Sequence, residues 1–90
     1  MKLELKKFGT TLSSRPAAKD AWLATRAYIL SGKKPGEKIE VDFAGVEVLT
    51  PSWADEFISA LKQEYPNDVV LLSSKNASVN MSLEFVGKRG

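Results

Sequence analysis

The chain has 90 residues and a formal net charge of +2, from 13 lysine and arginine against 11 aspartate and glutamate residues. This length holds one hydrophobic core, so we expect a single domain over residues 1–90. Cysteine and histidine are both absent, which excludes disulfides, cysteine-ligated metals and, within this chain, the Ser-His-Asp and Cys-His hydrolase arrangements.

The first half of the sequence predicts a strand, a helix and a second strand. Apolar and charged residues alternate over residues 3–5, as in a strand with one buried face. From Pro16, which suits the first turn of a helix, apolar residues recur at helical spacing as far as Ile29. Gly32 then ends the predicted helix. Alternation resumes over residues 39–43 and predicts the second strand.

The second half predicts a helix, a strand and a third helix. Pro51 opens a helix whose apolar residues recur every four positions from Trp53 to Leu61. The continuous apolar run at residues 69–72 predicts a strand buried on both faces, and helical spacing returns over residues 79–86. This order implies right-handed crossovers and an α/β fold. We expect a three- or four-stranded, mostly parallel or mixed sheet with about three helices.

The start of the second helix is the first candidate site. Thr50, Pro51 and Ser52 follow an apolar segment and open a helix, where unpaired backbone N–H groups and the helix dipole favour an anion. A phosphate on Ser52 would be stabilised there. Alternatively, Thr50 or Ser52 serves only as the N-cap, and Ser52 with Asp55 also fits a capping box. The neighbouring Asp55 and Glu56 would repel an added phosphate.

Three further features are candidates for chemistry or binding. Arg15 can hold a carboxylate or phosphate of a partner, or is an ordinary surface cation. Asp42, Asp55 and Glu56 can perform acid–base work or hold Mg²⁺; alternatively Asp42 faces solvent and the other two complement the helix dipole. Trp53 is expected in the core, but its place in the first turn makes it a candidate contact residue if it is partly exposed.

Four segments together resemble the small family of STAS-like domains of unknown function. They are a glycine turn at residues 8–9, a serine–arginine helix start at 12–15, an aspartate–phenylalanine strand at 41–46 and a serine–aromatic–alanine–aspartate–glutamate helix start at 51–57. That family is similar in turn to anti-sigma factor antagonists, which are STAS domains. In those proteins a partner kinase phosphorylates a serine at the corresponding helix start, which switches binding to an ATPase-type anti-sigma partner. Ser52 occupies the matching position.

The sequence therefore favours a noncatalytic regulatory module that binds another protein through residues 50–52 and the exposed side of the helix that follows. By resemblance, the partner is a kinase-like ATPase or a regulator of transcription, and no cofactor is implied. The alternative is a small ligand- or nucleotide-binding or catalytic domain that uses Arg15 and the carboxylates. Nucleic-acid binding is a third interpretation, which the dispersed positive charge disfavours.

Location and assembly are predicted from general features of the chain. No segment approaches the roughly 20 apolar residues of a membrane span, and the first residues lack the apolar run of a signal peptide. We therefore expect a cytoplasmic protein. A thin sheet has exposed edges, so the predicted fold is compatible with a homodimer.

Overall fold

Two parallel sheets form the framework of the computed structural model, which describes residues 1–89 and the side chains of residues 1–87. The main sheet has the order β1-β3-β5, and its strands are β1 (Lys2–Glu4), β3 (Ile39–Asp42) and β5 (Val69–Leu71). Val41 is central to its register, because it pairs with Leu3 on one side and with Leu71 on the other. The smaller sheet pairs β2 (Thr11–Leu12) with β4 (Val48–Leu49).

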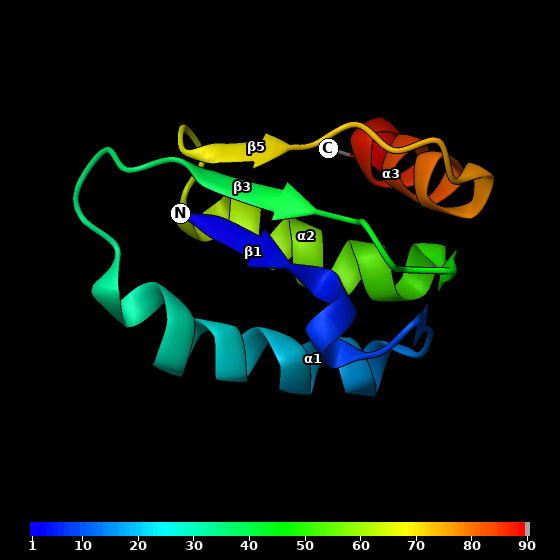
Figure 1. The fold of residues 1–90 in the computed structure, drawn as a ribbon, viewed down its shortest axis with the longest axis horizontal. Helices are drawn as coiled ribbons and strands as arrows, with labels where there is room; N and C mark the ends of the chain where they lie inside the picture. The colour runs from blue at the N-terminus through cyan, green and yellow to red at the C-terminus, as the bar shows by residue number, and fades with distance from the viewer. Residues whose placement is uncertain (90) are drawn as a thin grey trace.

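Helices connect these strands and lie mainly to one side of the main sheet (Figure 1). They are α1 (Arg15–Ala24), α2 (Pro51–Glu64) and α3 (Ala77–Arg89). Helices α1 and α2 form the two crossovers of the main sheet, and α3 packs against α2 and beside β4. The predicted α/β class, with about three helices and a parallel sheet, is confirmed. None of the helices within residues 1–89 is long and apolar enough to cross a membrane.

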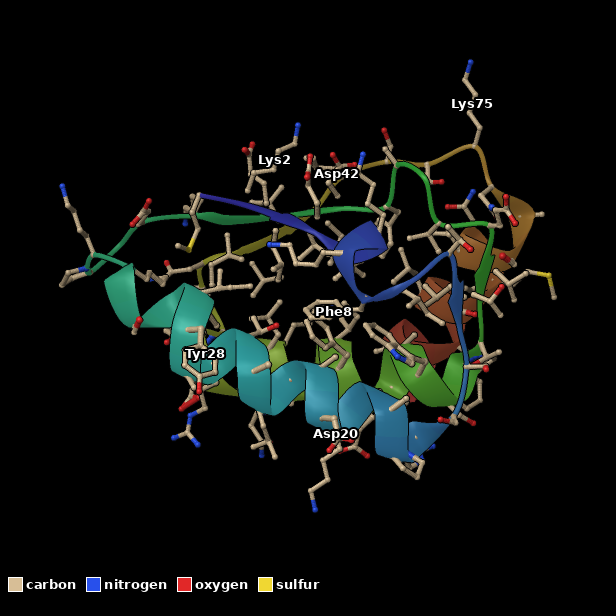
Figure 2. All side chains as sticks on the ribbon, turned by 60° about the horizontal axis from the view of Figure 1, so that its bottom comes forward. Lys2, Phe8, Asp20, Tyr28, Asp42 and Lys75 are labelled. Carbon is tan, nitrogen blue, oxygen red and sulfur yellow. The ribbon has the colours of Figure 1, made fainter. Side chains whose placement is uncertain are left out.

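The main sheet has one buried face and one open face. Leu3, Ile39 and Val41 are fully buried between the sheet and the helices. Lys2 and Asp42 point away from the helices on the open face (Figure 2). The period of two along each strand thus separates core from solvent, as the alternation over residues 3–5 and 39–43 predicts. Both outer edges of this sheet belong to short strands, and a homodimer through them stays a prediction.

The expectation that residues 69–72 are buried on both faces is wrong. The structure places β5 at the edge of the sheet, with Val70 on the open face and 40% exposed. Its neighbours Val69 and Leu71 are only partly buried against the core. A continuous apolar run is typical of a strand with helices on both sides, but here the helices cover only one face, so alternate residues reach solvent.

Helix α1 continues beyond Ala24 in two less regular turns. Residues Thr25–Ile29 form a π-helical turn, and a 3-10 turn (Leu30–Gly32) follows. Thr25 is fully buried, and its hydroxyl has no hydrogen-bond partner within the described residues. The helix therefore extends as far as the apolar spacing predicts, but its last two turns depart from α-helical geometry.

Candidate functional site

Helices α1 and α2 begin side by side because the strands before them, β2 and β4, are parallel neighbours. The Thr50 N–H donates to the Leu12 carbonyl oxygen at 3.0 Å, and the Thr50 hydroxyl donates to the same oxygen at 3.3 Å. These bonds join the residue before α2 to the strand before α1. Both helix starts consequently lie at the same end of the molecule, on the right in Figure 1.

Thr50, and not Ser52, is the N-cap of α2. Its hydroxyl oxygen accepts the Trp53 N–H at 3.3 Å. Ser52 is the second residue of the helix, is exposed to solvent, and has no side-chain hydrogen bond within residues 1–89. The capping box proposed for Ser52 with Asp55 is wrong for the same reason. The structure therefore assigns the cap to Thr50 and leaves the Ser52 hydroxyl available to other molecules.

Arg15 connects the two helices through the carboxylates of α2. Its Nη1 donates to Asp55 Oδ2 at 2.7 Å and lies 3.6 Å from Glu56 Oε1. Asp55 is 8% exposed, and its second oxygen accepts the Ser59 hydroxyl at 3.2 Å. The hydrogen bond to Asp55 raises the pKa of Arg15 above its usual value. Arg15 thus already holds two carboxylates of its own chain. Neither interpretation of Arg15 from the sequence, as a ligand for a partner's anion or as an ordinary surface cation, anticipated this pairing.

The expectation that Asp55 and Glu56 complement the helix dipole from the first turn of α2 is wrong. Because α2 begins at Pro51, both residues lie in its second turn, and the first turn contains no acidic residue. The helix dipole acts mainly over the first turn. Their contacts with Arg15 explain these two carboxylates better than the dipole does.

A pocket of about 350 Å³ opens beside Arg15. Its floor is the exposed face of α2, with α1 on one side and α3 on the other. Its lining residues are Arg15, Asp55, Glu56, Ser59, Ala60, Gln63 and Val86. Helical spacing from Ser52 could have identified Ser59 and Gln63, which follow it by seven and eleven positions on the same face. No local pattern predicts Val86, because α3 reaches the pocket through tertiary packing.

Trp53 is a core residue, as first expected from the sequence, and the partial exposure on which its role as a contact residue depended is not found. Its side chain is 1% exposed. The indole stacks on Phe57 at a centroid distance of 4.8 Å and lies 6.3 Å from the ring of Phe8. Phe8 comes from the 3-10 turn Leu5–Phe8, which lies between the sheet and the helices (Figure 2). This turn covers the first residues of α2 and excludes solvent from Trp53.

Asp42 lies apart from the other two candidate carboxylates. Its Oδ1 accepts the Ala44 N–H at 3.0 Å, and its Oδ2 is 3.4 Å from Lys2 Nζ, on the open face of the sheet. Asp55 and Glu56 belong to the opposite, helical layer. The predicted trio for acid–base work or Mg²⁺ therefore does not assemble, and the described residues contain no cluster of three metal-ligating side chains.

Replacing Asp42 with asparagine should reduce stability near neutral pH and have little effect in strong acid. The hydrogen bond from the Ala44 N–H, followed by the interaction with Lys2, lowers the pKa of Asp42 below its usual value. A carboxylate with a lowered folded-state pKa stabilises the fold above its unfolded pKa, and this contribution is lost as the pH falls through the folded pKa. Thermal unfolding of both proteins at about pH 7 and about pH 2 measures the difference.

Glu40→Gln is the matched control for Asp42→Asn, since it removes the same charge from an exposed position of the same strand. It should change the unfolding temperature little at either pH. If Asp42→Asn lowered the unfolding temperature equally at both pH values, hydrogen-bond geometry, and not charge, would account for the contribution of Asp42 to stability.

Comparison with protein-family models matches residues 26–80 to a STAS-like domain of unknown function (DUF4325). This match covers more than half of the chain and includes β3, β4, α2 and β5. It confirms the resemblance to the STAS-like family. Arg15 lies before the matched residues, and Ser52 lies within them. Neither the curated proteins nor the solved structures that were searched gave a match.

Proposed function

The chain belongs to the family of STAS-like domains of unknown function, and from this premise we propose that it is a noncatalytic regulatory module that binds another protein through a surface centred on Ser52. The observation that carries the proposal is the exposed Ser52 hydroxyl in the first turn of α2, beside the start of α1. The similarity of the family to anti-sigma factor antagonists favours a kinase-like ATPase or a regulator of transcription as the partner. The proposal retains the cytoplasmic location expected from the sequence.

The arrangement of the charged residues supports binding over catalysis. Arg15 and Asp55 are hydrogen-bonded to each other, and Asp55 also accepts the Ser59 hydroxyl. A substrate could recruit the buried Asp55 carboxylate only by breaking this network. Because Asp42 is directed to the other face of the sheet, the alternative catalytic or nucleotide-binding domain lacks its third carboxylate. We therefore expect no thermal stabilisation by nucleotides with Mg²⁺.

Phosphorylation of Ser52 is the form of regulation that this site would support. The phosphate would lie at the positive end of α2, which favours it, and within one helical turn of Asp55 and Glu56, which repel it. The modification would add close to two negative charges to the contact surface. We propose that it weakens partner binding by placing a bulky, strongly hydrated group in the contact surface, with no change of fold.

Site-specific crosslinking tests the proposed surface. A photoreactive amino acid at Ser52 should capture a defined partner in the native host, identified by mass spectrometry, whereas the same group at Tyr28 should not. Tyr28 is 83% exposed and lies toward the far end of the helix that begins with α1 (Figure 2). Purification of the Tyr28 variant, which retains Ser52, reports whether this serine carries a phosphate. Equal capture from both positions would count against a surface centred on Ser52.

Ser52→Glu provides the quantitative version of this test. The larger side chain should obstruct the contact surface and reduce capture of the identified partner. The thermal unfolding temperature should stay close to that of the parent chain, because Ser52 is exposed and its side chain makes no hydrogen bond among the described residues. Asp55 is unsuitable for such a test, since it is buried and hydrogen-bonded to Arg15. Partner binding that is unchanged by Ser52→Glu would contradict the proposed role of Ser52.

A further inference from the structure

The pocket beside Arg15 carries more negative than positive charge. One guanidinium and two carboxylates line it, which leaves a formal charge of −1. The positive charge of Arg15 is directed to Asp55 at 2.7 Å, a typical length for a charge-assisted hydrogen bond. Glu56 Oε1 lies farther away, at 3.6 Å, and forms the longer of the two ion pairs with Arg15. The Glu56 carboxylate therefore keeps acceptor capacity for a second cation.

The remaining lining of the pocket suits a long cationic side chain. The Ser59 hydroxyl donates a hydrogen bond to Asp55, so the lone pairs of the Ser59 oxygen remain as acceptors. The exposed amide of Gln63 offers a carbonyl oxygen, and Ala60 and Val86 supply apolar surface for methylene groups. A volume of about 350 Å³ is near the lower limit for ligand pockets, which is appropriate for one side chain.

We propose that this pocket binds an arginine side chain of the protein partner, and that the Glu56 carboxylate is the main acceptor for its guanidinium. This inference rests on the proposed protein-binding function and specifies the chemistry of the partner. A guanidinium has five donors in a plane and matches a carboxylate with two parallel hydrogen bonds. An incoming carboxylate or phosphate would meet a pocket that already has excess negative charge. Arg15 accordingly organises the acceptors and is not the receptor for an anion.

Titration with single amino-acid derivatives tests this chemistry without knowledge of the partner. N-acetyl-arginine amide, added to the ¹⁵N-labelled chain, should shift the backbone amide signals of Ser59, Ala60 and Gln63 in nuclear magnetic resonance spectra. N-acetyl-glutamate amide should not shift them. Glu56→Gln should raise the dissociation constant for the arginine derivative by about threefold, as expected for loss of a partly exposed ion pair.

Glu40→Gln is the control, because it removes an equal charge from the opposite face of the sheet and should leave this dissociation constant unchanged. Larger shifts with the glutamate derivative, arginine-induced shifts outside the pocket, or equal weakening by Glu40→Gln would each overturn the inference. These results are independent of the crosslinking at Ser52. A negative arginine titration alone would leave the proposed protein-binding function intact. Failure of the Ser52 crosslinker to capture a partner would contradict that proposed function.

Discussion

Replacing Trp53 with alanine is expected to lower the free energy of unfolding by about 3–5 kcal/mol, the usual range for a large buried aromatic side chain. Trp53 is fully enclosed, stacks on Phe57 at 4.8 Å and lies against Phe8. Its removal would leave a cavity between α2 and the 3-10 turn above it. Domains of this length have a total free energy of unfolding of about 5–13 kcal/mol, so the expected loss is a large fraction of the total. Urea denaturation followed by circular dichroism measures it.

Trp22→Ala is the matched control for this substitution. Trp22 is only partly buried and meets Phe57 edge-on at a centroid distance of 6.1 Å. Its removal should cost clearly less than that of Trp53, because the cavity would open to solvent and fill with water. A Trp53→Ala protein as stable as Trp22→Ala would contradict the buried position of Trp53. Trp53 would then again be a candidate for direct contact with a partner.

The repeating local patterns in the sequence were sufficient to predict the main elements of the fold. Alternation over residues 39–43 identified β3, and prolines at positions 16 and 51 located the starts of α1 and α2 to within one residue. The exposure of β5 was not predictable in this way. An apolar run shows that a segment avoids water, but whether one or two faces are covered depends on where the helices pack.

The strand-to-helix turn at residues 50–52 was predicted from the sequence and is present in the structure. The contacts around it were not predicted. The hydrogen bond between Arg15 and Asp55 joins residues 40 positions apart, and no local pattern encodes such a pair. The same holds for Trp53, whose burial depends on the distant Phe8. Regular periodicity thus predicted the elements, whereas the charges and rings at the site were arranged by tertiary packing.

Asn76→Ala is expected to lower the free energy of unfolding by about 2–3 kcal/mol, through loss of a helix cap and of two further hydrogen bonds. The Asn76 Oδ1 accepts the backbone N–H groups of Ser78 and Val79 at 2.8 and 3.2 Å, at the start of α3. Its Nδ2 donates to the carbonyl oxygens of Val46 and Glu47 at 3.1 and 2.9 Å. One side chain therefore fastens α3 to the segment that leads through β4 to α2.

Asn80→Ala is the control, since Asn80 lies on the same helix and its amide donates to Ser74 alone among the described residues. Its loss should cost about 1 kcal/mol or less. Because residues 46 and 47 lead through β4 to residues 50–52, Asn76→Ala should also speed amide hydrogen exchange at the start of α2, which Asn80→Ala should not. If the two variants were equally stable, water would be replacing the Asn76 amide at both carbonyl oxygens. The hydroxyls of Ser78 and Ser82, which also bond to residues 47 and 49, would then be sufficient to hold α3 in place.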